Sequence, residues 1–274
     1  MGISGSKTAS DSDTLAKATH DAYPEYYIEG VTINSNDEEL TTTSWNLLMS
    51  GHDTEVFLTK KKIDPNFMYT TTLSWFYDSF YHSFFELAPD VKSMFTNVSI
   101  VHQGKLLAAV IASALSSLKK PTILRKKLLE LVIGHNAKGV KAVHYGKMGL
   151  ALVGSLEEVL GTTVFSAEIK RSWLRIYSFM LSIIVPEAVK FSLGLGKPDI
   201  STLTRSNSTS TISGAASHIE NTLLHMIHFR PSNKVYRQES PIITQQAQGE
   251  QVSSHFFTTS IKYDVIFNFL RSKY

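Results

Sequence analysis

The sequence has no cysteine among its 274 residues. This absence excludes disulfide bonds, thiolate catalysis, zinc ribbons and cysteine-ligated iron–sulfur clusters, and it leaves histidine and carboxylate side chains as the candidate metal ligands. An excess of charge of one sign is also lacking, since 27 basic and 24 acidic residues give a formal net charge of +3. So small a charge does not predict nucleic-acid binding unless the basic residues cluster on one face.

Long hydrophobic runs are missing as well. A membrane-spanning helix needs about 18 apolar residues in succession, and the nearest runs, around residues 106–118 and 176–191, are interrupted by polar residues or proline. The first 15 residues lack the apolar core of a secretory signal. They begin Met1-Gly2-Ile3-Ser4-Gly5-Ser6, a pattern that fits myristoylation of Gly2. We expect a cytoplasmic protein that, if Gly2 is acylated, contacts membranes reversibly, because one acyl chain anchors only weakly.

Composition divides the chain into three parts. Residues 1–38 are rich in Ser, Thr, Asp and Gly without sustained periodicity, and nine of the thirteen residues over 201–213 are Ser or Thr. Segments of this kind bury too little apolar surface to offset the entropy of folding. The sequence therefore predicts a flexible N-terminal arm over 1–38, a folded domain over 39–192 and a largely disordered tail over 193–274.

Apolar residues of the central part recur at three- and four-residue spacing, which is typical of amphipathic helices. The clearest stripes are Leu106, Leu107, Val110, Ile111, Ala114, Leu115 and Leu118, followed by Leu124, Leu128, Leu131 and Val132. Further helices are expected over 39–50, from about 145 to Gly161 and from about Ser166 onward. Asp64-Pro65 resembles a helix start, with an aspartate cap and a proline in the first turn, before an aromatic-rich helix over 67–87. The sequence shows no convincing alternation of period two, so the domain is predicted to be all-α with six or more helices.

His135 is the first candidate functional residue. It follows Leu131 by four residues and Leu128 by seven, so it projects from the apolar face of its helix. A neutral imidazole in this position can bind a metal through one nitrogen while a hydrogen bond holds the other. The alternative is a buried histidine that is satisfied by a backbone carbonyl, and periodicity alone favours this alternative.

The residues around His135 belong to a longer pattern. The run Leu131-Val132-Ile133-Gly134-His135-Asn136-Ala137-Lys138-Gly139-Val140 precedes His144-Tyr145 and Gly149-Leu150-Ala151-Leu152, and upstream stand Phe80-Tyr81-His82-Ser83-Phe84-Phe85-Glu86-Leu87-Ala88-Pro89-Asp90-Val91-Lys92-Ser93-Met94-Phe95 and Gln103-Gly104-Lys105-Leu106-Leu107. These segments resemble, in this order along the chain, the second helix with its corner, the start of the distal helix and the proximal segment of globins, especially of the bacterial haemoglobin and flavohaemoglobin type. With Trp45 matching the first helix and Trp173 and Tyr177 the last, the resemblance covers residues 39–191. It implies a globin fold, with six to eight helices around a heme pocket.

On the proximal side, the resemblance implies that His135 is the ligand of the iron in heme b, and that a tyrosine and a glutamate raise its basicity. Tyr145 matches the tyrosine. Glu187 is a loose match for the glutamate, because it is one residue out of position and follows Pro186, which would break the helix. Phe95 would stack on the porphyrin at the corner before the distal helix, the alternative being an ordinary core residue.

On the distal side, the resemblance implies that Tyr81 and Gln103 face the bound gas, with Leu107 one turn further. A tyrosine hydroxyl and a glutamine amide can both donate hydrogen bonds to bound dioxygen, so this polar pocket should retain oxygen. The alternatives are a Tyr81 hydroxyl that points to solvent and a Gln103 on the surface. A shift of the helix by one residue would bring His102 to the iron instead, although the following Gly104-Lys105 favours Gln103.

The function that follows from the resemblance is reversible binding of oxygen by a heme globin, for storage or transport, with nitric oxide and carbon monoxide as further ligands. Flavohaemoglobins convert nitric oxide to nitrate with a fused reductase, so we expect such turnover here to need a reductase in trans. The alternative is a membrane-associated heme-based gas or redox sensor that signals through its tails, and a third hypothesis is a globin-like interaction module that has lost heme. No paired carboxylates, nucleophile elbow or phosphate loop occur at useful spacing in the sequence, so nothing indicates a hydrolase.

Overall fold

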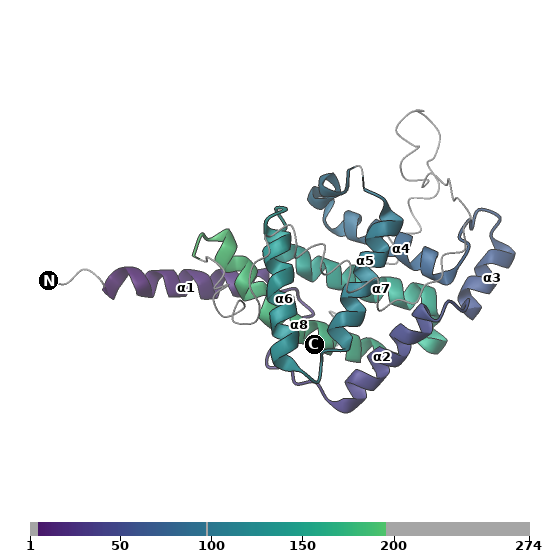
Figure 1. Cartoon of the computed structure of the whole chain (residues 1–274), viewed down its shortest axis with the longest axis horizontal. Coiled ribbons are helices and arrows are strands. Elements are labelled where there is room, and N and C mark those ends of the chain that lie inside the picture. The colour runs from purple at the N-terminus through teal and green to yellow at the C-terminus, as the bar shows by residue number, and fades with distance from the viewer. Residues whose placement is uncertain (1–4, 97, 196–274) are drawn as a thin grey trace, which may run out of the picture. The chain divides into compact units, whose positions relative to one another are not determined.

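The computed structural model describes residues 5–96 and 98–195, and this part of the chain is helical without β-strands. The elements are α1 (Gly5–Ala22), α2 (Ser35–Met49), α3 (Glu55–Ile63), α4 (Thr72–Leu87), the 3-10 helix η1 (Pro89–Phe95), α5 (Ile100–Leu115), α6 (Pro121–Asn136), α7 (Ala142–Val164) and α8 (Ala167–Ser192) (Figure 1). The predicted all-α class is confirmed.

Helices α7 and α8 form the centre of the fold. They pack against each other, α4 packs on α7, and α2 and α6 pack on α8 (Figure 1). The core between α2 and α8 is aromatic: Trp173 is 1% exposed, its ring meets Trp45 edge-on at 6.1 Å, and its Nε1 donates to Ser44 Oγ at 3.0 Å. The hydroxyl of Ser44 gives the buried indole N–H a partner, so this aromatic core leaves the Trp173 donor satisfied.

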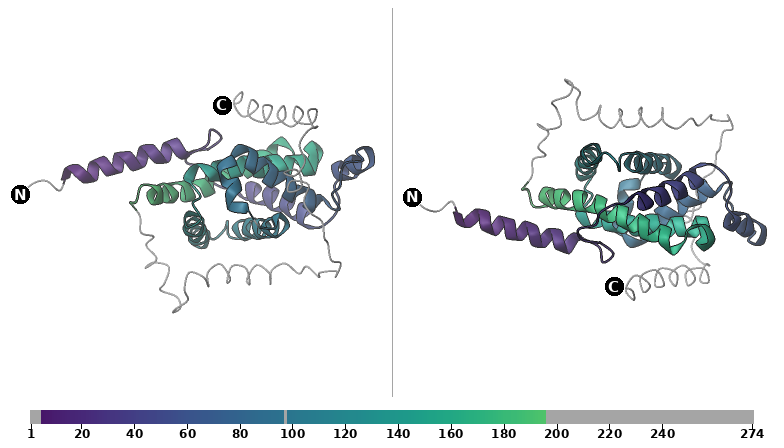
Figure 2. Two further views of the ribbon diagram at one scale, coloured as in Figure 1. Left: turned by 90° about the horizontal axis from the view of Figure 1, so that it is seen from above. Right: turned by 90° about the horizontal axis from the view of Figure 1, so that it is seen from below.

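Helices α5 and α6 lie next to each other on the same side of α7 (Figures 1 and 2). The main packing partners of α5 are α4 and α2, and that of α6 is α8; within the described residues α5 and α6 are not main partners of each other. Gly104 sets the position of α5, because a Cβ at this residue would lie 2.4 Å from Cγ of Tyr77 on α4. The absence of a side chain therefore allows α5 to approach α4 closely.

The helix start predicted at Asp64-Pro65 is wrong. Asp64 follows the last residue of α3, and its carboxylate accepts the N–H of Asn66 at 2.9 Å in a local turn. Helix α4 begins after Thr71 instead, where a reciprocal capping box satisfies the free N–H groups: Thr71 Oγ1 accepts from Ser74 N–H, and Ser74 Oγ accepts from Thr71 N–H, both at 3.1 Å. At Thr71 two reciprocal hydrogen bonds cap the helix, whereas the Asp64 carboxylate bonds only within a local turn. The helix start after Thr71 is therefore the more stable one.

The helix breaks expected in α7 and α8 have different outcomes. Gly161, where α7 was expected to stop, does interrupt the regular helix with a φ of 74° and a ψ of 159°, and one short turn follows this kink to Val164. Helix α8 continues through Pro186 to Ser192, although proline removes one hydrogen bond. Val185 and Val189 are buried on either side of the proline, and their burial offsets that loss.

The N-terminal segment is the main difference from the predicted organisation. Instead of a disordered arm over 1–38, residues 5–22 form α1 and α2 already begins at Ser35. Between them Tyr26 is 4% exposed, its hydroxyl donates to the Gly146 carbonyl at 2.8 Å, and the Ile28 N–H donates to Ser178 Oγ at 3.2 Å. A buried aromatic ring with a satisfied hydroxyl supplies the apolar contact that the composition does not indicate.

Two expectations fall on residues that the structure does not describe. Gly2, the predicted acylation site, and residues 196–274 of the predicted tail lie outside the described residues. Within 5–96 and 98–195 no single helix has the length and hydropathy needed to cross a membrane, and η1 with α5 meets the criteria only as a pair bent by 108°.

Candidate functional site

His135 lies near the end of α6 with one ring nitrogen engaged. Its Nδ1 is 2.9 Å from the carbonyl oxygen of Leu131, one turn earlier. Because a carbonyl only accepts, Nδ1 carries the proton and Nε2 keeps its lone pair. Burial lowers the pKa of His135 from its usual 6.5, and the charge of Lys138 lowers it further. The ring is therefore neutral at pH 7 and ready to donate Nε2 to a metal.

Tyr145 is next to His135 and has an unsatisfied hydroxyl. The two ring centroids are 6.0 Å apart, and Tyr145 on α7 is 3% exposed. Its hydroxyl has no hydrogen-bond partner among the described residues, and burial raises its pKa well above 10, so it stays a neutral donor. An unpaired buried hydroxyl costs about 1–3 kcal/mol, and in a native structure such a group calls for an explanation.

Tyr81 and Phe95 are brought together from α4 and η1. Their ring centroids are 5.5 Å apart, and Phe95 also meets Phe85 edge-on at 5.1 Å. Tyr81 is 6% exposed, and burial, aided by nearby Tyr77, raises the pKa of its hydroxyl. The hydroxyl therefore remains protonated and able to donate across the physiological range.

The three candidates on α5 differ in exposure. His102 is exposed, Gln103 is half-buried and Leu107, one turn after Gln103, is buried. The cap at Ser99, whose Oγ accepts the His102 N–H at 3.3 Å, starts the helix just before these residues. Gly104 faces α4, because a Cβ there would meet Tyr77. Of the three candidates on α5, Gln103 and Leu107 therefore lie on the inner side of the helix, whereas His102 is exposed.

A cluster that the sequence does not predict connects η1 to the start of α7. His144 is 2% exposed, its Nδ1 accepts the N–H of Lys141 at 3.1 Å, and its Nε2 lies 3.1 Å from Asp90 Oδ2 on η1. Lys141 Nζ also reaches Asp90, at 3.1 Å. Both nitrogens of His144 are thereby engaged, which excludes it as a second metal ligand in this arrangement. The sequence offers one signal for this cluster: His144 is the third residue of a helix that follows Lys141, and lysine is not a typical N-cap residue.

The same cluster connects the part of the site on η1 to the part on α7. Asp90 lies in the same short helix as Phe95, and His144 directly precedes Tyr145. Hydrogen bonding to Lys141 lowers the pKa of Asp90, and its interaction with His144 acts in the same direction. Burial lowers the pKa of His144, which Asp90 only partly opposes. The link is therefore made by a neutral imidazole that donates from Nε2 to a carboxylate.

Glu187 lies elsewhere than the loose match suggested. Its carboxylate contacts Lys190 Nζ at 3.0 Å and Arg125 of α6 at 3.9 Å. The Tyr145 hydroxyl donates no hydrogen bond to it, since that hydroxyl has no partner in the described part of the chain. The glutamate ties α8 to α6 rather than completing the surroundings of His135.

Comparison with models of known protein families matches residues 78–184 to the family described as Globin. The match begins within α4 and ends within α8. It contains six of the residues to which the resemblance assigned a role, and the loosely matched Glu187 lies just beyond it; the six are Tyr81, Phe95, Gln103, Leu107, His135 and Tyr145.

Proposed function

Because the chain belongs to the globin family through its residues 78–184, we propose that it binds heme b and reversibly binds oxygen at the heme. The single observation that carries the proposal is the pairing of His135 with Tyr145: a neutral imidazole whose Nδ1 is held by Leu131 lies beside a buried tyrosine hydroxyl that has no partner within the described residues. In this arrangement Nε2 of His135 would ligate the iron.

The other residues fit the same group. Tyr145 offers a buried hydroxyl without a protein partner beside His135, and Phe95 and Tyr81 offer a ring pair on η1 and α4. Heme would supply an iron centre that binds diatomic gases, and the amino-acid side chains do not bind these gases by themselves. His135 would hold the group, Phe95 would pack on it, and Leu107 would exclude water from its distal side.

The distal residues support oxygen as the ligand. Tyr81 keeps its proton because burial raises its pKa, and Gln103 carries two N–H donors on the half-buried face of α5. Both can donate to a ligand that gains negative charge on binding, which slows its escape. Carbon monoxide gains little charge and would benefit less, so these donors would shift the ratio of the two affinities toward oxygen.

The first experiment tests heme binding through His135. Absorption spectra of the full chain with heme are compared in the ferric, reduced and carbon monoxide forms for the parent, His135→Gly and the control His82→Ala. His82 is half-exposed and pairs with Glu86 at the surface, so this control should match the parent. We expect His135→Gly to lose the Soret shift with carbon monoxide, and added imidazole to restore it. Equal spectra for parent and His135→Gly would refute the assignment.

The second experiment tests the distal pair. Tyr81→Phe and Gln103→Leu should each raise the oxygen dissociation rate about five- to tenfold, the equivalent of one lost hydrogen bond. His102→Leu serves as the matched control on the same helix, and we expect it to leave the rate within about twofold. A large effect of His102→Leu with none of Gln103→Leu would assign the distal role to His102.

We also propose that the oxygenated protein converts nitric oxide to nitrate, and a separate experiment tests this activity. The oxygenated protein is mixed rapidly with one equivalent of nitric oxide, and ferric heme and nitrate are measured. Formation of both in equal amounts supports a dioxygenase that obtains electrons from a reductase in trans, whereas absence of nitrate leaves oxygen binding alone.

A sensor is a second candidate, favoured by the docked N-terminal segment. Tyr26 donates to the carbonyl of Gly146, which adjoins Tyr145, so a change at the heme can reach this segment. We expect oxygen to alter proteolysis within residues 23–34, and to alter partition of the acylated chain onto vesicles if Gly2 carries myristate. Tyr26→Phe should weaken both responses. Unchanged proteolysis and partition on ligand binding would remove this candidate.

A further inference from the structure

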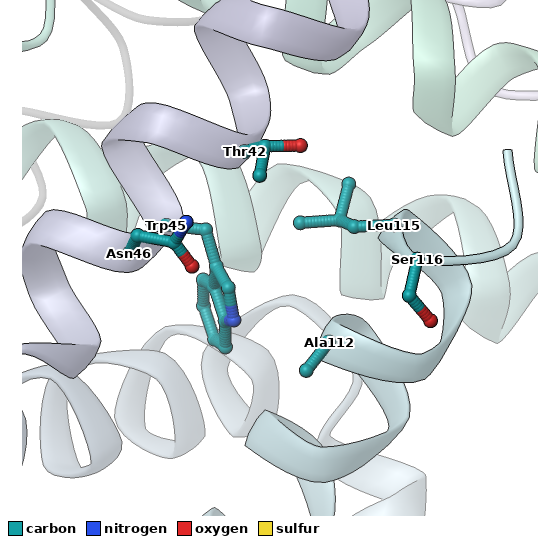
Figure 3. A pocket seen from close by; sticks show the side chains of 6 residues that line it. All are labelled: Thr42, Trp45, Asn46, Ala112, Leu115 and Ser116. Atoms are coloured by element: carbon teal, nitrogen blue, oxygen red, sulfur yellow. The ribbon is translucent and has the colours of Figure 1, made fainter.

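A second pocket lies between α2 and the end of α5, apart from the residues assigned to the heme. It has a volume of about 160 Å³. The six residues that line it are Thr42, Trp45, Asn46, Ala112, Leu115 and Ser116 (Figure 3). Trp45 and Leu115 are buried and form its floor, whereas Asn46, Ala112 and Ser116 are exposed at its rim. The pocket is therefore reachable from solvent and apolar at its base.

The indole N–H of Trp45 has no partner within the described part of the chain, although Trp45 is 2% exposed. Trp173, which packs against it, satisfies the same group through Ser44 at 3.0 Å. Figure 3 shows the nitrogen edge of the Trp45 ring turned toward Ala112 on α5. A buried N–H donor is thus left free at the floor of an open pocket, where a bound molecule can accept its hydrogen bond.

The lining restricts the chemistry of such a molecule. None of the six residues is charged, and the flanking pair of Glu38 and Lys119, 3.4 Å apart, neutralises its own charges while joining α2 to the segment after α5. An ionic ligand would be desolvated without a counter-charge. In volume the pocket is close to the engineered apolar cavity of about 150 Å³ that holds benzene in another protein.

We propose that this pocket is a binding site for a small uncharged molecule with one six-membered ring and a carbonyl or ether oxygen. The ring lies on Trp45 and Leu115, and the oxygen accepts the hydrogen bond from Trp45 Nε1. The rim amide of Asn46 and hydroxyl of Thr42 remain solvated and tolerate polar substituents.

The test uses two probes of the same shape, acetophenone and α-methylstyrene, in which a methylene group replaces the carbonyl oxygen. The full chain, reduced and under carbon monoxide, is titrated while the indole ¹⁵N–¹H resonances are recorded. We expect acetophenone to shift the Trp45 resonance downfield in a saturable way. Trp173, already bonded to Ser44, is the internal control and should stay in place.

Two variants separate the hydrogen bond from the shape of the pocket. Trp45→Phe keeps an aromatic floor and should weaken acetophenone about fivefold while leaving α-methylstyrene unchanged. Because this variant lacks the Trp45 indole reporter, binding of both probes to it and to the parent is compared by ligand-detected NMR. Ala112→Leu, at an exposed position, should exclude both probes without unfolding the chain. The proposal is overturned by no shift up to the solubility of acetophenone, by equal binding of both probes to the parent, or by a long-lived water at Trp45 that neither probe displaces.

Discussion

The contact of Gly104 with Tyr77 allows a quantitative test of how α5 is positioned. In Gly104→Ala the new Cβ would lie 2.4 Å from Tyr77 Cγ and 2.7 Å from Cδ1 and Cδ2. Carbon atoms prefer about 3.5–4.0 Å, so the ring or the helix must move by about 1 Å. Overpacking of this size costs about 1–3 kcal/mol, against a gain of up to about 1 kcal/mol from replacing a helical glycine. We expect a net loss of about 1–2 kcal/mol.

Gly134→Ala is the matched control, because a Cβ at Gly134 meets nothing within 4 Å. It should stabilise the apo chain by about 0.5–1 kcal/mol through helix propensity alone. Urea unfolding followed by circular dichroism measures both variants. In a Tyr77→Ala background Gly104→Ala should lose its cost, which gives a coupling energy of at least about 1 kcal/mol. If Gly104→Ala is as stable as Gly134→Ala, or keeps its cost without Tyr77, then this contact does not position α5.

Two further predictions concern single side chains. Asp37→Ala removes the carboxylate that accepts the Asn34 N–H in the capping box of α2, together with the hydrogen bonds that Ser172 and Arg175 donate to it, both at 3.0 Å, and should lower the free energy of unfolding by about 3 kcal/mol in urea titrations; a loss below about 1 kcal/mol would contradict this. The pKa of His135 is lowered from 6.5, so its contribution to stability is complete above pH 6.5 and is lost as the pH falls toward the lowered value. The parent should therefore lose more stability than His135→Gln between about pH 7.5 and 5.5 in the apo form, and equal losses would show that folding does not lower the pKa of His135.

The helical class and most helix positions could be predicted, because the apolar stripes of α5 to α8 repeat with a period that only a helix matches. What the sequence could not provide is the choice between competing local signals. Asp64-Pro65 has the residue types of a helix start, yet Thr71 and Ser74 cap each other reciprocally and begin α4 later. Pro186 has the residue type of a helix end, yet burial on both sides carries α8 past it.

Contacts between distant residues were beyond the sequence for a related reason. The N-terminal segment has a composition typical of disorder, and its order depends on Tyr26 meeting Gly146 and Gly149, more than a hundred residues away. A Cβ at Gly149 would lie 2.1 Å from the Tyr26 hydroxyl, and one at Gly146 would lie 3.0 Å from Cβ of Pro24, so two glycines on α7 create the space into which Pro24 and Tyr26 fit. Neither the tyrosine nor the glycines carry a sequence pattern that predicts this contact.

His135 and Tyr145 illustrate how the two kinds of information combine. The spacing of His135 left a metal ligand and a satisfied core histidine open, and the geometry shows that the backbone carbonyl of Leu131 satisfies only Nδ1. A hydrogen bond at Nδ1 is also what a metal ligand needs to hold its tautomer, so the observation that seemed to support the core alternative fits the ligand equally well. Tyr145 breaks the tie, because a structure that satisfies its other buried tyrosine hydroxyls at Tyr26 and Tyr177 leaves this one, beside His135, without a partner.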